Sequence, residues 1–471
     1  MPKNDPTFGM SLERKITEDL DEWLSNKAKK PLVLRGARQV GKSTLVRILA
    51  QKKGRRLIEL NLEKKPKLAK IFEQIDAEQI LGDLSIELDL AVDPKRDLLF
   101  IDEIQACPKA LTSLRYFYED HPGLPVIAAG SLLDFALSEE KVSMPVGRIS
   151  YAFVNPMTFE EFLSAAGKPR LLREIQEFEW DKKISETAHR HLLEQLEIYA
   201  RVGGMPEVVQ TYLATSDLSR VRGIQEEILA TYRDDFGKYA SGRTLLLLQR
   251  LYDGMSAVLG QKIKYAQLSR EDHSRDIRAV IELLVQARIL GRVSHSDCDG
   301  VPLALHQSDS IYKLYHLDVG LMNAQLGVPM RKGVLQDDQR SPVLGQWLGV
   351  QAEQIVYQNL KASQSKQDLK IYYWLREGKS QNAEVDFVLE AGGDLLPVEV
   401  KSGASGSLRS LFQLVARQKM KKALRFDLNL PSTQNIQTEV ITAAGGESIK
   451  FRLLSLPLYL VGQYQRLEES S

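Results

Sequence analysis

The sequence has few cysteines, almost no net charge and no long apolar run. Its two cysteines, Cys107 and Cys298, cannot form a zinc cluster. A disulfide is one alternative, but we expect free thiols in a reducing cytoplasm. The 63 lysines and arginines nearly balance 62 aspartates and glutamates, and this excludes an evenly basic protein that coats nucleic acid. No run reaches the ~18 apolar residues that cross a bilayer, and the polar start MPKNDPTFGM does not resemble a secretory signal. We therefore expect a cytoplasmic location and no membrane partner.

The sequence does have the length and apolar content for several packed cores. At 471 residues and 43% hydrophobic content, two to four domains are expected. Short apolar strands alternate with helical stretches in the first third, and this alternation predicts an α/β fold with a parallel sheet. The predicted strands there are residues 31–35, 57–61, 98–101 and 126–129. An amphipathic helix over residues 11–30 precedes them.

Residues 36–43 read GARQVGKS and match the phosphate-loop pattern G-x-x-x-x-G-K-[ST]. An apolar strand precedes the loop and a helix follows it, as the pattern requires. The glycines let the backbone turn tightly, so that N–H groups and the helix N-terminus face phosphate oxygens. Lys42 is expected to reach the β- and γ-phosphates, and Ser43 to hold Mg²⁺. The predicted nucleotide-binding residues are Gly36, Ala37, Arg38, Gln39, Val40, Gly41, Lys42, Ser43 and Thr44.

The stretch LLFIDEIQ predicts the other half of the nucleotide site. Its apolar residues form a strand that ends at Asp102, on the sheet edge where α/β proteins bind ligands. Asp102 is expected to support Mg²⁺, and Glu103 to polarise the attacking water. An acidic turn at a strand end is the alternative for this stretch alone. Together with the phosphate loop, the pair predicts binding and hydrolysis of ATP or GTP.

Two weaker catalytic candidates follow. Ser131 ends the next strand and could sense the γ-phosphate or the water, although a helix N-cap explains it equally well. Arg148 could stabilise transition-state charge in its own or a neighbouring subunit. The alternative for Arg148 is an ordinary surface arginine.

Beyond these motifs, the sequence resembles a large group of bacterial and archaeal AAA+-type ATPases with a C-terminal domain of unknown function. The matching stretches are GARQVGKST, FIDEIQ, AAGSLL, VGRISYAFVNPMTFEEFL, VGGMPEVV, YKLYHLDVGLMNAQLG and AEVDFVLE. The resemblance covers nearly the whole chain. It implies an α/β multidomain protein with an AAA+ core, a helical and winged-helix middle and a restriction-endonuclease-like end. It also implies ATP rather than GTP, and a ring-like homo-oligomer, of which a hexamer is one size.

On this basis we divide the chain into four predicted domains. They are an AAA+ P-loop ATPase core over residues 1–155, a helical lid or linker over 156–240, a winged-helix-like domain over 241–340 and a restriction-endonuclease-like domain over 341–471. The Gly203-Gly204 turn in the helical region could act as a hinge or as an ordinary turn.

Residues 261–293 predict a short helix, a polar turn, a longer helix and a strand, which is a winged-helix pattern. In such a module the N-terminus of the second helix can face base edges in DNA. Arg275 and Arg278 are the candidates for that role, and Lys262 and Lys264 are candidates for phosphate contacts. Acidic neighbours dilute this charge, so protein docking is the alternative.

The C-terminal third contains a D…ExK pattern. Asp386 and Glu399 lie on two strand-like segments joined by a turn, and Lys401 follows on the same face as Glu399. Glu353, on an upstream helix, could supply a third carboxylate. In nucleases such carboxylates hold Mg²⁺ and the lysine orients the nucleophile. A charged hairpin with a Lys–Glu pair looks the same. Downstream lies a basic stretch formed by Arg417, Lys419, Lys421, Lys422 and Arg425, which could follow a phosphate backbone or form a solvated face.

The leading hypothesis is an ATPase that uses Mg²⁺ and couples hydrolysis to DNA binding, with DNA cleavage or remodelling as a further step. A second hypothesis is a nucleotide-gated interaction switch whose C-terminal domain does not cleave. A third, a small-molecule kinase, is disfavoured because the Asp102-Glu103 pair suits water activation.

Overall fold

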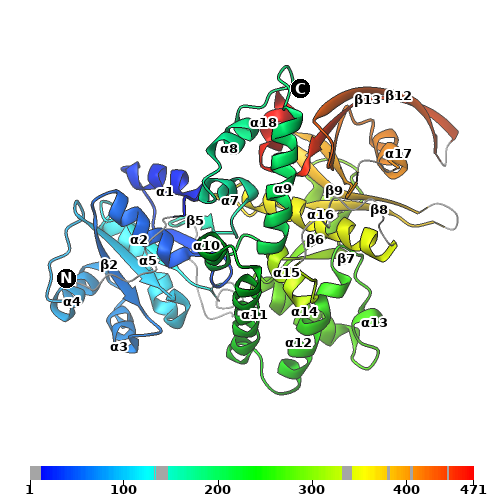
Figure 1. The fold of residues 1–471 in the computed structure, drawn as a ribbon. Helices are drawn as coiled ribbons and strands as arrows, with labels where there is room; N and C mark the ends of the chain where they lie inside the picture. Colours follow the sequence, from blue (N-terminus) through cyan, green and yellow to red (C-terminus); the bar gives the residue numbers. More distant parts are fainter. Residues whose placement is uncertain are drawn as a thin grey trace. The chain divides into compact units, whose positions relative to one another are not determined.

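The computed structural model describes residues 12–131, 133, 147–330, 342–378, 382–403, 407–442 and 445–471, so the polar start of the chain lies outside the described residues. The chain forms two compact units (Figure 1). Unit 1 consists of Met1–Asn155, Ile281–Ile289 and Gln364–Asp368, and unit 2 of Pro156–Val280, Leu290–Ser363 and Leu369–Ser471. Both cysteines are buried and free. No helix among the described residues has the length and apolar character to span a bilayer.

Unit 1 is built on a five-stranded parallel sheet with the strand order β2-β3-β4-β1-β5. The strands are β1 Leu32–Arg35, β2 Arg56–Asn61, β3 Asp97–Asp102, β4 Val126–Ala129 and β5 Ser150–Phe153. The first four confirm the predicted strands, and β5 adds an edge strand that periodicity did not predict. β3 is buried along its whole length, as expected for a central strand of a parallel sheet.

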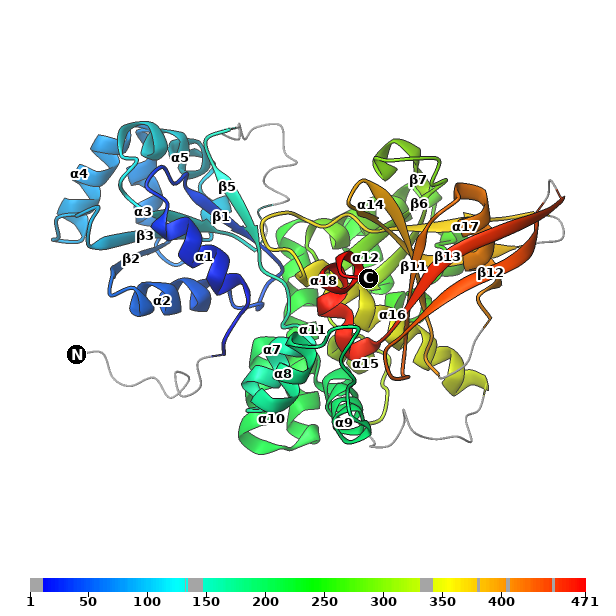
Figure 2. The same cartoon turned by 90° about the horizontal axis from the view of Figure 1, so that it is seen from above.

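Helices cover both faces of this sheet, with α2 on one side and α4 and α5 on the other (Figure 2). The helices of unit 1 are α1 Ile16–Ser25, α2 Lys42–Lys52, α3 Pro66–Ala69, α4 Ala77–Glu87 and α5 Pro108–Asp120, with the 3-10 turns η2 Lys70–Glu73 and η3 Ile104–Ala106. Local sequence fixes where two of them begin. Asp76 accepts a hydrogen bond from the backbone N–H of Gln79 at 3.0 Å and caps α4. Pro108 occupies the first turn of α5, where its missing N–H is not needed.

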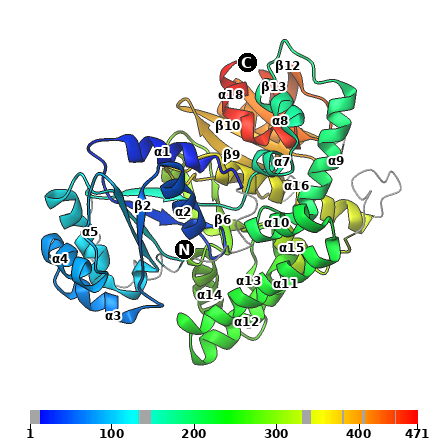
Figure 3. The same ribbon diagram turned by 60° about the vertical axis from the view of Figure 1, so that its left-hand side comes forward.

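The first part of unit 2 is helical (Figure 3), as the sequence predicted. Its helices are α7 Phe159–Ala165, α8 Pro169–Gln176, α9 Glu186–Val202, α10 Pro206–Thr215, α11 Leu218–Asp235, α12 Gly242–Met255, α13 Tyr265–Leu268 and α14 Ser274–Gln286, which crosses the division between the units. The 3-10 turns of unit 2 as a whole are η4 Phe236–Lys238, η5 Ser256–Val258, η6 Leu303–His306 and η7 Leu458–Gln463. A capping box formed by Thr158 and Glu161 begins α7.

The rest of unit 2 contains an eight-stranded mixed sheet with the order β12-β13-β11-β10-β9-β8-β6-β7. The strands are β6 Leu290–Ser296, β7 Gln307–His316, β8 Tyr372–Arg376, β9 Ala383–Ala391, β10 Asp394–Val400, β11 Lys422–Asp427, β12 Ser432–Thr442 and β13 Gly445–Pro457. The antiparallel pairing of β9 with β10 confirms the predicted hairpin. The long β12–β13 hairpin was not predicted. Because β6 and β7 belong to this sheet, the sheet continues across the predicted boundary near residue 340.

The remaining helices of unit 2 are α15 Val319–Gln325, α16 Pro342–Ala362, α17 Arg409–Gln418 and α18 Tyr464–Glu469. α17 packs on one face of the sheet and α16 on the other (Figure 2). Side chains alternate along β9, so that Val385 joins the apolar core under α17 while Asp386 faces away from it. The chain therefore presents polar β9 side chains on the α16 side of the sheet.

The Gly203-Gly204 turn, which the sequence left open as a hinge, lies in a buried junction of unit 2. The N–H of Gly204 donates to Asp318 Oδ2 at 2.6 Å, and its carbonyl accepts from the N–H of Met157 at 2.7 Å. Gln358 Nε2 donates to the same Asp318 oxygen at 3.0 Å. A Cβ added at Gly203 would overlap the Asp318 carboxylate, and one at Gly204 would overlap the Met157 carbonyl oxygen. The glycines are thus required by close packing around Asp318.

Candidate functional site

The phosphate loop connects β1 to α2 in unit 1. Gln39 and Gly41 both have positive φ angles, 64° and 93°, which fold the loop tightly before the helix begins. Arg14 links the loop to the segment after β5. Its guanidinium donates to the carbonyl of Val40 at 3.2 Å and to that of Asn155 at 2.6 Å. A turn of this kind directs successive backbone N–H groups into one concave surface, which suits an anion. Sequence reasoning did not identify Arg14.

Lys42 lies inside this loop and is buried. Its Nζ donates to the carbonyl oxygens of Gly36 at 2.9 Å and Ala37 at 2.7 Å. Burial lowers the pKa of Lys42 to about 8, although the nearby carboxylates of Glu103 and Asp102 act in the opposite direction. A phosphate group beside the amine would favour its charged form. The environment of Lys42 therefore fits a polyphosphate ligand, in agreement with the sequence motif.

Ser43 and Asp102 meet at the sheet edge as predicted. Ser43 Oγ donates to Asp102 Oδ2 at 3.0 Å, and Asn61 Nδ2 approaches the same oxygen at 3.3 Å. Burial raises the pKa of Asp102, and the charge of Glu103 adds to the effect. A hydroxyl and a carboxylate are the hard oxygen donors that Mg²⁺ prefers. These two side chains therefore fit a nucleotide-bound Mg²⁺.

Glu103 follows Asp102 in a left-handed backbone conformation, with φ of 51°. Its Oε2 accepts hydrogen bonds from Gln105 Nε2 at 2.7 Å and from Ser131 Oγ at 3.3 Å. For Ser131 the sequence leaves a polar sensor and a helix N-cap open, and the structure places its hydroxyl against the Glu103 carboxylate. A Cβ added at Gly130 would overlap Oε1 of the Gln105 amide, so the Gln105 side chain lies directly against this glycine.

Sequence reasoning missed Asn61 and Gln105. Asn61 ends β2 directly opposite Asp102, which ends β3 in the parallel register. Gln105 is the last letter of the stretch LLFIDEIQ that predicted the acidic pair. A useful signal was therefore present, because polar residues at the carboxyl ends of neighbouring parallel strands converge.

Arg148, the other predicted catalytic residue, lies beside α5. Its Nε donates to Glu119 Oε1 at 2.8 Å, and Arg115 pairs with the same oxygen at 3.0 Å. The Glu119 carboxylate raises the pKa of Arg148. The structure thus places Arg148 in an ion pair on the surface of unit 1, and its transition-state role stays a prediction.

The four predicted DNA-binding residues lie on or next to α13 and α14 in unit 2. Lys262 pairs with Glu377 at 2.7 Å. Arg275 is 93% exposed and lies 3.6 Å from Asp276, whereas Lys264 and Arg278 are exposed. Their contact with DNA stays a prediction.

Asp272, one of the acidic residues near the start of α14, is compensated by two arginines. Asp272 pairs with Arg243 at 3.4 Å and also with Arg250. These arginines lie on α12, and both hold the same carboxylate. Around the start of α14, Lys264, Arg275 and Arg278 remain exposed, together with the acidic residue Glu271 and the partly exposed Asp276.

The C-terminal D…ExK residues come together in unit 2. Glu353 lies on α16, Asp386 on β9 and Glu399 on β10, and Lys401 pairs with Glu399. Burial raises the pKa values of Glu353 and Glu399 above those of an ordinary glutamate. Sequence reasoning missed a further residue in this cluster, Lys313 of β7, which lies 3.6 Å from Glu353 and 3.9 Å from Asp386.

The predicted nuclease metal does not fit this arrangement. No group of three His, Cys, Asp or Glu side chains within the described ranges is placed to hold a metal ion. A buried ammonium lies among the carboxylates instead. The residues of the D…ExK pattern are thus assembled, but not as a set of metal ligands.

The downstream basic stretch is largely ion-paired. Arg417 pairs with Asp299 at 2.9 Å, Lys422 with Glu468 at 3.0 Å and Arg425 with Asp427 at 2.9 Å. Three of its five charges are thus compensated within unit 2, which favours the solvated or structural alternative over a phosphate-binding track.

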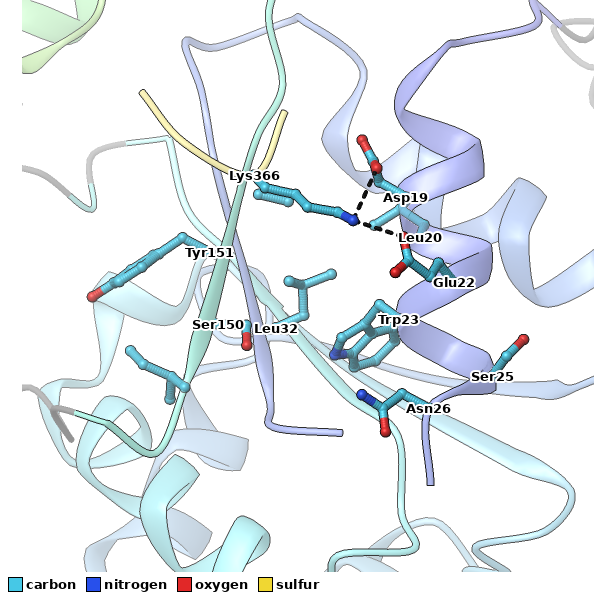
Figure 4. A pocket seen from close by; sticks show the side chains of 12 residues that line it. Asp19, Leu20, Glu22, Trp23, Ser25, Asn26, Leu32, Ser150, Tyr151 and Lys366 are labelled. Carbon is cyan, nitrogen blue, oxygen red and sulfur yellow. Dashed lines mark hydrogen bonds and ion pairs between the residues drawn. The ribbon is translucent and has the colours of Figure 1, made fainter. Parts of the chain in front are cut away.

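A pocket of about 710 Å³ lies between α1 and the edge strand β5 of unit 1 (Figure 4). Lys366 reaches across it to Asp19 at 3.5 Å and Glu22 at 2.6 Å. Leu32 and Ser150, at the starts of β1 and β5, also line it. The phosphate loop follows the opposite end of β1, so this pocket is separate from the phosphate site.

Comparisons with known proteins agree with the geometry of unit 1. Residues 28–163 match a family model described as an AAA domain. Residues 193–332 and 348–444 match two models described only as domains of unknown function, DUF8612 and DUF4143. No curated protein matches the chain. Residues 28–163 are therefore similar to an AAA domain, in agreement with the phosphate loop and the acidic strand end of unit 1.

Solved structures give weaker likenesses. The Walker-type ATPase PABY2304 of Pyrococcus abyssi is 18% identical, with a TM-score of 0.42, over 67% of this chain and 96% of that one. The Thermotoga maritima RuvB Holliday junction branch migration motor is 18% identical, with a TM-score of 0.30, over 62% and 92%. C. elegans PCH-2 is 11% identical, with a TM-score of 0.28, over 44% and 65%.

Proposed function

We propose that the protein hydrolyses ATP with Mg²⁺ and uses the cycle to act on nucleic acid. The observation that carries the first half is the convergence of Lys42, Asp102 and Glu103 at one end of the parallel sheet, with Ser43 bonded to Asp102 at 3.0 Å. A phosphate-binding loop, a cation-supporting carboxylate and a second carboxylate for water are the parts that phosphoryl transfer to water needs.

Each side chain has a defined task in this proposal. Lys42 neutralises negative charge on the β- and γ-phosphates, and Ser43 and Asp102 hold the cation. Glu103 accepts a hydrogen bond from the attacking water and orients it, while Gln105 fixes the carboxylate through its 2.7 Å hydrogen bond. Mg²⁺ supplies charge stabilisation on the phosphate oxygens when it is bound with the nucleotide.

The variant Glu103→Gln tests hydrolysis. It keeps the size and hydrogen-bonding reach of the side chain but removes its negative charge, so ATP should bind within about threefold of the wild-type affinity. Turnover should fall by about 10² or more, the range expected for loss of a residue that orients or activates water. Steady-state phosphate release and nucleotide binding by fluorescence measure the two effects.

The matched control is Glu87→Gln on the exposed end of α4, which should leave both quantities unchanged. If Glu103→Gln turns over at the wild-type rate, Glu103 does not act on the water and the proposed site is wrong. If wild type and Glu103→Gln both bind ATP but neither hydrolyses it, unit 1 is a nucleotide switch rather than an ATPase.

The second half of the proposal rests on the charge around α14. Arg243 and Arg250 compensate Asp272, and exposed Lys264, Arg275 and Arg278 remain as positive groups. A helix start with exposed arginines suits contact with phosphates and base edges. We propose that α13 and α14 with the following strand form a winged-helix nucleic-acid surface in a ring-like homo-oligomer.

A further inference from the structure

Lys313 brings a positive charge to the C-terminal acidic cluster from β7, a strand far from the D…ExK residues in sequence. It lies on β7, opposite Val293 of β6, and its side chain is 0% exposed. Tyr315, two residues later on the same strand, points to the same side because strand side chains alternate. Its hydroxyl donates to Glu353 Oε2 at 2.7 Å. β7 therefore delivers two donors to the carboxylates that α16 and β9 supply.

The ammonium of Lys313 lies among three carboxylates from two elements. Its Nζ is 2.5 Å from Glu384 Oε1, 3.6 Å from Glu353 Oε2 and 3.9 Å from Asp386 Oδ1. The ammonium also lies over the ring of Tyr373, 5.3 Å from its centroid. The carboxylates and the aromatic face both stabilise a protonated lysine in this position.

A divalent ion shared by these carboxylates would need the same space. Mg²⁺ and Ca²⁺ sit roughly 2.0–2.6 Å from their oxygen ligands, whereas the ammonium is already within 4 Å of all three side chains. Two positive centres at that separation, inside a protein, would repel strongly. Lys313 and a metal ion are therefore alternatives for one position.

The carboxylates of the D…ExK pattern also have other internal donors. The backbone N–H of Val400 donates to Asp386 Oδ2 at 2.8 Å, and Lys401 pairs with Glu399. The carboxylates of Glu353, Glu384 and Asp386 around Nζ balance the charge of the buried ammonium.

We propose that Lys313 is a built-in cation that takes the place of a divalent metal in the C-terminal cluster, so that this domain neither binds metal there nor cleaves phosphodiester bonds. The domain has the strands and the helix expected for the predicted nuclease. Its acidic residues are stabilised by the ammonium of Lys313 instead of by a bound metal ion. This inference goes beyond ATP hydrolysis and is independent of it.

The test measures Mn²⁺ binding to the full chain without nucleotide, from the loss of the free-ion electron paramagnetic resonance signal. Wild type and Asp386→Asn should bind Mn²⁺ equally weakly. Lys313→Met leaves three carboxylates without their cation and should gain one saturable site, with a dissociation constant at least tenfold below that of wild type. Lys313→Arg keeps the charge and should behave as wild type.

The proposal is overturned if Asp386→Asn binds Mn²⁺ ten times more weakly than wild type does. It is also overturned if wild type shows Mn²⁺-dependent DNA cleavage that Asp386→Asn lacks. Equal, tight binding by wild type and Lys313→Met also overturns it. If Lys313→Met does not fold, the double variant Lys313→Met, Glu384→Gln is used in its place. This double variant removes one carboxylate together with the lysine. The comparison of wild type with Asp386→Asn tests the proposal even if neither Lys313 variant folds. None of these measurements depends on ATP hydrolysis.

Discussion

The imidazole of His316 is buried at the end of β7, where it forms part of the Asp318 junction. Its Nδ1 accepts a hydrogen bond from the N–H of Asp318 at 3.2 Å. The Gln354 amide bonds both backbone groups of His316, at 2.8 Å and 2.7 Å. Burial lowers the pKa of His316 to about 4. The folded protein therefore holds this histidine neutral where an unfolded chain would protonate it.

This histidine makes stability depend on pH in the acidic range. Unfolded histidine takes up its proton near pH 6.5 and folded His316 near pH 4, so its contribution is complete above about 6.5 and is lost as the pH falls to about 4. The loss is on the order of 3 kcal/mol. His316→Asn keeps an acceptor for the Asp318 N–H and removes the titration. Urea unfolding of both proteins between pH 4 and 8 measures the difference, with exposed His273→Asn as control.

The advantage of wild type over His316→Asn should shrink steadily from pH 7 to pH 4, whereas the His273→Asn curve should run parallel to wild type. Parallel curves for all three proteins would contradict a neutral buried His316.

Single residues were predictable where the chain places partners close in sequence or at the ends of paired strands. Lys42, Ser43, Asp102 and Glu103 stand out because a loop and a strand end each have a short, specific pattern. Lys313 had no such signal, since its partners lie 40 to 73 residues later on α16 and β9. Only the three-dimensional pairing of the strands brings that lysine to the carboxylates.

The glycine pair between α9 and α10 lets the chain pass close to a neighbouring backbone segment. Gly204 packs directly against the backbone of Met157, so the methyl group of Gly204→Ala should force the two backbones apart. We expect a loss of about 1–3 kcal/mol in unfolding free energy, the usual range for overpacking. Gly254→Ala, on α12 with open space around it, should instead stabilise by about 0.5–1 kcal/mol. Thermal and urea unfolding compare the two variants.

Equal stability of wild type and Gly204→Ala would mean that the junction yields easily and can act as a hinge after all. A loss confined to Gly204→Ala supports a fixed joint between α9 and α10.

Elements were predictable where apolar periodicity was strong. The strands β1 to β4 and the β9–β10 hairpin follow from apolar runs and turn residues. β12 was missed because its sequence, STQNIQTEVIT, is mostly polar, as befits a strand at the edge of a sheet. The joining of β6 and β7 to the C-terminal sheet was also missed, because strand neighbours in space are not fixed by local sequence.

For the molecule as a whole, the net charge of +1 averages over groups that the fold sorts into separate places. Negative charge collects at Asp102 and Glu103 in unit 1 and around Lys313 in unit 2. Positive charge remains exposed at the start of α14. The near-neutral composition is therefore compatible with one nucleotide site and one nucleic-acid surface, each of local sign.

The most direct measurement is ATP hydrolysis with and without duplex DNA at low salt, for wild type and for Arg275→Glu combined with Arg278→Glu. The control is Arg170→Glu combined with Lys183→Glu, which makes the same charge change at exposed positions on and after α8. We predict that DNA raises the rate of wild type and of the control at least threefold, that the α14 variant keeps its basal rate without responding, and that added salt removes the stimulation. A rate that DNA leaves unchanged in wild type, or raises equally in the α14 variant, would contradict nucleic-acid coupling through this helix.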